Sequence, residues 1–302
     1  MKRANYFLVD VFTEIKHGGN QLAVFPDALG IPEDQMQSIA NEFNLSETTF
    51  VLPPEDKEND FKVRIFTPMQ ELPMAGHPTI GTAFIMARRV PFDESADEFE
   101  MRLEEKVGLI PVNLKISKGI PTLVTMTQPN PTFSPEVGSR ELWAELLGLS
   151  ENDISDQSPS QTVSCGVPYL IIPVKTLDAV SRIDFRLDVW KRIRQDMNPG
   201  FVYAYTLETV DNHDVHGRMF APETGVLEDA ATGSANGPLG AYLVKHGLIA
   251  NGQMTSMVSE QGYEMGRKSL LYLGIEKRGN DITRVDVGGH CVIVGKGEIY
   301  LD

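Results

Sequence analysis

One local pattern occurs twice in this 302-residue chain, and it constrains the fold more than any other feature. In each copy an Arg-x-Phe-x-Pro segment, typical of a strand end, is followed by a glycine-bearing turn of small residues and then by an apolar helix. The first copy covers residues 64–81 and the second covers residues 218–237. Arg64 and Arg218 lie 154 positions apart (218 − 64), about half the chain. The repeat therefore predicts two similar lobes, each presenting a helix N-terminus from an equivalent place.

The two helix starts are candidate anion-binding sites. Unpaired backbone N–H groups and the positive end of the helix dipole favour a negative ligand at such a terminus. In the second copy, Gly233, Ser234 and Ala235 could donate hydrogen bonds to an anion, with ordinary helix capping as the alternative. If the two termini face each other, they would hold a small acidic molecule between the lobes.

The composition is typical of a soluble globular protein. Apolar residues make up 41% of the chain and charged residues 23%. The formal net charge of −15 argues against nucleic acid or an anionic membrane surface as the main partner. The negative net charge does not exclude an anionic small ligand, because the positive potential at a local pair of helix N-termini can outweigh the negative potential of more distant charges.

The cysteine content and the absence of targeting patterns favour a cytoplasmic protein. Cys165 and Cys291 are far apart and form neither a disulfide framework nor a zinc motif, which fits a reducing compartment. The N-terminal residues are too polar for a signal peptide, and no run of 18 apolar residues occurs. We therefore expect no membrane association.

Strand patterns dominate the chain, with roughly one buried helix per lobe, which predicts an α+β architecture. The helix after Gly76 is apolar almost all round, so we expect it at the centre of its lobe. A proline cluster at 129–135 is the best candidate for the crossing between lobes. We expect an N-terminal lobe over 1–128 and a C-terminal lobe over 129–302, with a last strand that can return to the first lobe.

Three side chains beside these turns are candidates for catalysis. Burial of Glu47 before an apolar strand would raise its pKa, making it useful as acid and base near neutral pH; the alternative is an exposed turn residue. His77 lies at a helix start, where the dipole favours neutral imidazole; the alternative is a packing role. Asp229 could accept a hydrogen bond from a substrate amine or hydroxyl, or could simply cap a turn.

Two further patterns do not support a site. The segment 262–269 resembles a phosphate-binding loop, but it is one residue short and runs into a strand pattern. His213 and His216 are three apart in a segment that we interpret as a loop with no third ligand nearby. We therefore expect no metal.

Several motifs together resemble the phenazine-biosynthesis PhzF family over nearly the whole chain. They are Asn44–Thr48, Phe66–Pro68, Gly76–Thr79 and Asp229–Ala235, with Gly19-Asn20, Gln261-Gly262 and Met265–Arg267 in support. The resemblance implies a diaminopimelate-epimerase-like fold, in which two pseudo-symmetric lobes each curl a mostly antiparallel sheet around a central helix. It also implies an active site in the cleft between the lobes, catalysis without a cofactor, and a homodimer.

The family's best-known reaction is isomerisation of trans-2,3-dihydro-3-hydroxyanthranilate. The resemblance implies that Glu47 moves the proton, and that Gly76, His77, Asp229 and Ser234 hold the substrate and assist the shift. We therefore expect a proton-shift isomerase acting on a small carboxylate-bearing substrate by general acid/base catalysis. The alternatives are a non-catalytic binder of small acids and an epimerase or racemase that works without thiols.

Overall fold

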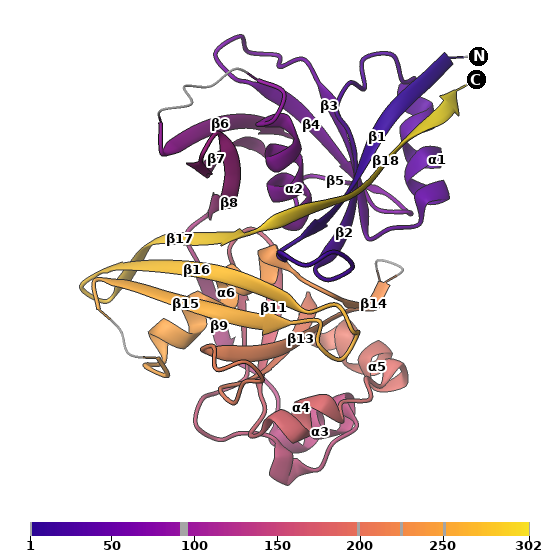
Figure 1. Cartoon of the computed structure of the whole chain (residues 1–302). Coiled ribbons are helices and arrows are strands. Elements are labelled where there is room, and N and C mark those ends of the chain that lie inside the picture. Colours follow the sequence, from indigo (N-terminus) through magenta and orange to yellow (C-terminus); the bar gives the residue numbers. More distant parts are fainter. Residues whose placement is uncertain (1, 91–95, 198–199, 224–225, 250–251, 302) are drawn as a thin grey trace. The chain divides into compact units, whose positions relative to one another are not determined.

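The computed structural model describes residues 2–90, 96–197, 200–223, 226–249 and 252–301. Backbone contacts divide the chain into two compact units (Figure 1). Unit 1 comprises Met1–Thr127 and Gly288–Asp302, and unit 2 comprises Gln128–Val287. The final strand therefore belongs to the unit that the N-terminus builds.

Unit 1 is a curled, mixed sheet with one helix inside it and one outside. Its elements are β1 (Lys2–Val11), β2 (Asn20–Phe25), α1 (Glu33–Phe43), β3 (Glu47–Leu52), β4 (Phe61–Phe66), β5 (Glu71–Leu72), α2 (His77–Met86), β6 (Glu98–Glu105), β7 (Gly108–Ser117), β8 (Ile120–Gln128) and β18 (Cys291–Leu301). β1 pairs antiparallel with both β18 and β2. β2 and β3 are parallel, β3 and β4 antiparallel, β4 and β6 parallel, and β6, β7 and β8 form an antiparallel meander.

The helix α2 is the core of unit 1. Every one of its residues is buried, and it contacts β1, β2, β3 and β7 (Figure 1). Gly81 permits this close approach, because a Cβ atom there would lie 2.6 Å from Leu22 Cδ2 and 2.7 Å from Val11 Cγ2. The central position predicted from the apolar pattern is thus explained by a helix without a polar face.

The outer face of this sheet is covered by α1. Met36, Ile39 and Ala40 of the helix pack on an aromatic cluster in which the rings of Phe25 and Phe50 stack with centroids 4.9 Å apart. Burial of such rings contributes more than their area alone, because offset aromatic pairs add roughly 0.5–1.5 kcal/mol. This core anchors the start of β3 and so helps to place Glu47.

Unit 2 repeats the scheme and adds three outer helices. Its elements are β9 (Thr132–Glu136), α3 (Arg140–Leu147), a 3₁₀ turn (Glu151–Asp153), β10 (Gln161–Ser164), β11 (Pro168–Pro173), α4 (Leu177–Ser181), α5 (Leu187–Met197), β12 (Phe201–Thr206), β13 (Val215–Ala221), β14 (Val226–Asp229), α6 (Gly233–Lys245), β15 (Met254–Gln261), β16 (Ser269–Arg278) and β17 (Asp281–Gly289), whose last two residues belong to unit 1.

The order of strand pairings in unit 2 matches that in unit 1. β10 pairs antiparallel with β9 and β11, β11 is parallel to β12, β12 is antiparallel to β13, and β13 is parallel to β15. The central helix is now α6, which contacts β10, β11, β15 and β16. Each unit therefore has an α+β architecture with a curled sheet around one buried helix.

The repeated arginines have the same structural task in both units. Arg64 pairs with Glu71 on β5, Arg218 pairs with Glu228 on β14, and each guanidinium lies 5.2 Å from a phenylalanine ring two residues further along its strand. Arg218 also donates to the carbonyl oxygens of Val180 and Ile183, at 3.1 Å each. These pairs close the short hairpins that precede the two central helices.

The outer helices of unit 2 were not expected from the sequence. They cover a separate apolar core in which Phe185 stacks on Phe220 with centroids 4.8 Å apart, and which also buries Trp143 and Trp190.

In the part of the chain that is described, none of the helices has the length and apolarity needed to cross a bilayer.

Candidate active site

Glu47 and His77 of unit 1 lie together. Asn44 ends α1 in the left-handed region, with φ of 50°, and its N–H donates to the Ala40 carbonyl, which turns the chain so that Glu47 begins β3. The parallel register of β2 and β3 places Glu47 opposite Leu22. The side chain of Glu47 is 16% exposed, so this carboxyl is largely removed from water yet still reachable.

His77 is the first residue of α2, and its imidazole is held on both sides. Nε2 lies 3.2 Å from Glu47 Oε2, and Nδ1 lies 3.2 Å from the amide nitrogen of Asn20. Burial lowers the pKa of His77 to about 3, so the ring is neutral near pH 7. The Gln21 backbone also contacts the ring, and the approach of Nε2 to Glu47 Oε2 does not have hydrogen-bond geometry.

Asp229 of unit 2 stands at the end of β14, just before α6. The hydroxyl of Thr232 donates to Asp229 Oδ2 at 2.5 Å. Gln261 holds the same turn, because its Nε2 donates to the Asp229 carbonyl at 2.8 Å and to Thr232 Oγ1 at 3.0 Å. The carboxyl of Asp229 is thus fixed by a buried hydrogen-bonded turn and remains partly exposed.

The first turn of α6 offers two amides to an anion. The N–H of Ala235 donates to the Thr232 carbonyl at 3.1 Å and is already occupied. The N–H groups of Gly233 and Ser234 have no hydrogen-bond acceptor among the described residues, as the four-residue rule for helix starts predicts. The Ser234 hydroxyl lies 2.7 Å from the Tyr169 hydroxyl. In unit 1, Gly76 caps α2 in the corresponding way, without a side-chain bond.

Comparison with known proteins identifies the family. The family model described as phenazine biosynthesis-like protein, PhzC-PhzF, matches residues 9–297. The chain belongs to this family. It is 37% identical over 297 residues to a trans-2,3-dihydro-3-hydroxyanthranilate isomerase of Pseudomonas fluorescens, covering 98% of this chain and 99% of that protein.

Solved structures agree with this membership. The crystal structure of a PhzF-family phenazine biosynthesis protein of Bacillus anthracis matches with a TM-score of 0.90 at 30% identity, covering 100% of both chains. A hydroxyproline epimerase of Agrobacterium vitis, 14% identical, has a TM-score of 0.66 over 99% of this chain and 91% of its own, and shares the fold alone. The predicted diaminopimelate-epimerase-like fold is confirmed, and the protein is an isomerase of PhzF type.

The sequence interpretation of His216 was wrong. In this PhzF-type isomerase His216 lies on β13, is fully buried, and bridges two carboxyl groups, with Nδ1 3.0 Å from Glu260 and Nε2 2.9 Å from Glu264. Burial lowers the pKa of His216, but hydrogen bonds to the two carboxylates outweigh it and raise the pKa to about 9. His213 also contacts Glu260, at 2.8 Å. Among the described residues, no group of three His, Cys, Asp or Glu is arranged to hold a metal ion.

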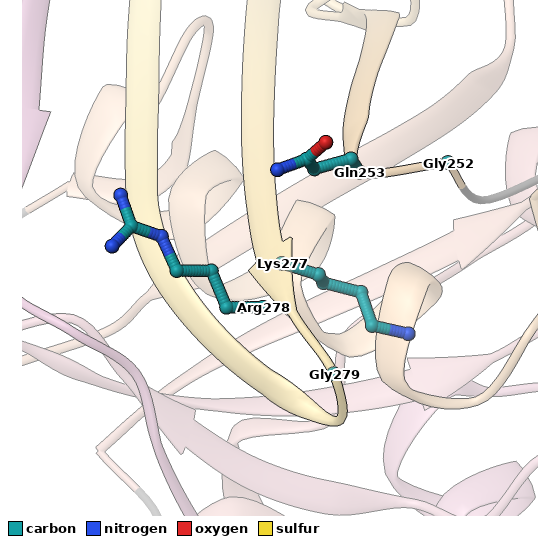
Figure 2. A pocket seen from close by; sticks show the side chains of 5 residues that line it. All are labelled: Gly252, Gln253, Lys277, Arg278 and Gly279. Carbon is teal, nitrogen blue, oxygen red and sulfur yellow. The ribbon is translucent and has the colours of Figure 1, made fainter.

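A hollow in unit 2 lacks the features of a catalytic site. It lies beside the turn after β16 and is lined by Gly252, Gln253, Lys277, Arg278 and Gly279 (Figure 2). Lys277 and Arg278 extend in opposite directions, so their charges do not converge on one point (Figure 2). The candidate polar groups described above lie elsewhere, at the start of α2 in unit 1 and at the start of α6 in unit 2.

Proposed function

We propose that this PhzF-type isomerase shifts a proton on a small carboxylate-bearing substrate without a cofactor, with Glu47 as the general acid and base. The contact between Glu47 and the neutral imidazole of His77 carries the proposal. A carboxyl that is largely removed from water and lies beside a neutral imidazole can accept a proton from carbon and return it to another carbon.

Each residue then has a defined task. Glu47 removes a proton from an activated carbon of the substrate and delivers it elsewhere on the same face. His77, whose imidazole lies 3.2 Å from the carboxyl, confines Glu47 and stabilises charge that develops beside it. Asp229, oriented by Thr232, accepts a hydrogen bond from a substrate amine or hydroxyl. One positioned acid/base contributes about 10²–10⁴ in rate.

The substrate class follows from the two helix starts and from the relatives. The N–H groups of Gly233 and Ser234 at the start of α6 suit a carboxylate. Relatives at 37% and 34% identity are named trans-2,3-dihydro-3-hydroxyanthranilate isomerase, and such a molecule carries a carboxylate, an amine and a hydroxyl. We infer that the substrate of this chain is a dihydro-hydroxyanthranilate-like acid.

The test is turnover of trans-2,3-dihydro-3-hydroxyanthranilate in heavy water, followed by absorbance and mass. We expect the product to gain deuterium from solvent, and Glu47→Gln to lower turnover by about 10²–10⁴ while the fold is retained. Glu42→Gln, at an exposed position on α1, is the matched control and should behave as wild type. Turnover of Glu47→Gln within a factor of ten of wild type would remove Glu47 from the mechanism.

Two other outcomes would favour the rival functions. Binding without turnover or deuterium exchange in the wild-type protein would indicate a binder of small acids. Loss of optical rotation at constant absorbance would indicate an epimerase.

We further propose that the protein is a cytoplasmic homodimer, by analogy with the family. A monomeric mass in sedimentation equilibrium would contradict the dimer.

A further inference from the structure

The internal repeat extends to polar side chains that the proposed mechanism does not use. In unit 1 the parallel strands β4 and β6 place Lys62 opposite Glu104, and in unit 2 the parallel strands β13 and β15 place His216 opposite Glu260. Lys62 and His216 each precede the repeated arginine by two residues. The next residues along β6 and β15, Glu105 and Gln261, therefore occupy corresponding positions.

Gln261 holds the start of α6 through its side-chain amide, and we call this set of hydrogen bonds to residues 232 and 236 the clasp. Its Oε1 accepts from the N–H of Thr232 at 3.1 Å and from Asn236 Nδ2 at 3.0 Å. Asn236 Nδ2 also donates to the Thr232 carbonyl at 3.0 Å, which uses its second hydrogen. Thr232 and Asn236 flank the segment that carries Ser234, so the clasp fixes the backbone of that segment.

Glu105 makes the same clasp on α2. Its Oε1 lies 2.5 Å from Thr79 Oγ1, and Thr79 Oγ1 lies 2.6 Å from the Ala75 carbonyl oxygen. The N–H of Ala75 also points to the Glu105 carboxyl. Ala75 and Thr79 thus correspond to Thr232 and Asn236, and His77 corresponds to Ser234.

The count of hydrogens requires a proton on Glu105. The hydroxyl of Thr79 has one hydrogen, and the Ala75 carbonyl can only accept, so that hydrogen is used in the bond to Ala75. The short contact between Thr79 and Glu105 must then be donated by Glu105 as a carboxylic acid. Asn236 has two hydrogens and needs no such donor, which is why an amide suffices at Gln261.

Burial also favours the neutral form of Glu105. The residue is 6% exposed, and its Oε2 makes no hydrogen bond within the described residues, which would be costly for a carboxylate. Burial raises the pKa of Glu105 to about 8 and outweighs the contacts with the Thr79 hydroxyl and the Ala75 backbone, which act in the opposite direction. The charged and titratable groups around it are Lys62 and Arg64 on β4, Glu71 on β5, Glu104 and Lys106 beside it in the chain, Glu55 and Asp56 in the preceding loop, and His77 on α2. Arg64 is engaged by Glu71, and Lys62 by Glu55.

We propose that Glu105 is a positioning residue that works as a neutral carboxylic acid, clasping the first turn of α2 and with it His77, and that loss of its proton loosens this turn and lowers turnover. The inference rests on the proposed function because the clasped turn carries His77. The matched change is Glu105→Gln, which installs the permanently neutral group found at Gln261. Glu104→Gln, one residue earlier and outside the clasp, is the control.

The experiment measures kcat and KM between pH 6 and pH 10 for wild type and both variants. Because the pKa of Glu105 is about 8, we expect wild type and Glu104→Gln to lose about tenfold in kcat between pH 7 and pH 9. Glu105→Gln should lose less than about twofold over that range. An equal alkaline loss in Glu105→Gln and wild type would overturn the proposal, and so would a Glu105→Gln protein that does not fold, since a neutral isostere must be accepted.

A second readout separates this inference from the proposed function. The ¹³C signal of the Glu105 carboxyl and the ring signals of His77 can be followed by NMR with no substrate present. We expect both to shift together as the pH passes about 8, and the His77 shift to be absent in Glu105→Gln. If His77 does not respond, the clasp is refuted even in an active enzyme. If it responds in a protein that turns over no candidate acid, only the proposed function fails.

Discussion

The buried imidazolium of His216 should make unit 2 lose stability in alkaline solution. Its pKa of about 9 exceeds the value of about 6.5 that an unfolded chain gives a histidine. A histidine whose pKa is raised on folding contributes stability that is complete below pH 6.5 and disappears as the pH rises through 9. The difference of roughly 2.5 units corresponds to about 3.5 kcal/mol at about 1.4 kcal/mol per unit, of which about 3 kcal/mol is lost between pH 6 and pH 10.

The perturbation is His216→Gln, which removes the titrating group and leaves Glu260 and Glu264 without their shared cation. Breaking a buried pair in this way costs about 3–5 kcal/mol at pH 6, and the difference from wild type should shrink by about 3 kcal/mol by pH 10. Lys62→Gln is the matched control, because Lys62 corresponds to His216 but pairs with an exposed Glu55, so about 1 kcal/mol or less is expected.

The assay is urea unfolding at several pH values, followed by tryptophan fluorescence. Both tryptophans of the chain, Trp143 and Trp190, lie in the outer core of unit 2, so the signal reports the unit that contains His216. Titration of Glu105 contributes to the pH dependence of both proteins and cancels in the comparison. Parallel curves for wild type and His216→Gln from pH 6 to pH 10 would refute the charge assignment.

Two further changes test how each unit holds its own candidate residues. Gly19→Ala places a Cβ 2.3 Å from the Val11 carbonyl oxygen at φ of 60°, so we expect the free energy of urea unfolding to fall by at least about 1–2 kcal/mol. We also expect a lower kcat, because the neighbouring residue Asn20 contacts His77. Wild-type values for both quantities would contradict this role of Gly19. Arg218→Lys should lower the free energy of urea unfolding by about 2–4 kcal/mol, which is more than we expect for Arg64→Lys. The reason is that Arg218, unlike Arg64, donates to two buried carbonyl oxygens. Equal losses in the two variants would show that those bonds contribute nothing.

The sequence predicted the regular elements where local chemistry decides them. The β4 strand occupies Phe61–Phe66, where polar and apolar residues alternate, and α1 begins directly after its N-cap residue Pro32. Proline at a helix start and alternating or β-branched residues in a strand act over a few residues. The paired helix starts were predicted for the same reason.

Features that depend on distant contacts could not be predicted in this way. Local propensity alone does not favour the first turn of α6 at Gly233, because Gly, Ser and Asn have low helix propensity and only the surrounding sheet makes them helical. His216 was assigned to a loop because its partners, Glu260 and Glu264, are more than 40 residues away. Gln261 gave no signal of its clasp, which needs the parallel register of β13 and β15.

The two units use one backbone scheme with different chemistry at matched positions. His77 in unit 1 corresponds to Ser234 in unit 2, and Glu105 corresponds to Gln261, whereas the clasped backbone atoms of Ala75 and Thr232 are the same. An amide keeps the same donors and acceptors at every pH, but a carboxylic acid can donate to its turn only while it keeps its proton. The ionisable clasp therefore lies in the unit that carries the acid/base residue Glu47, and the permanent clasp lies in the unit that we assign to substrate binding. If that assignment is correct, alkaline pH should lower kcat well before it raises KM.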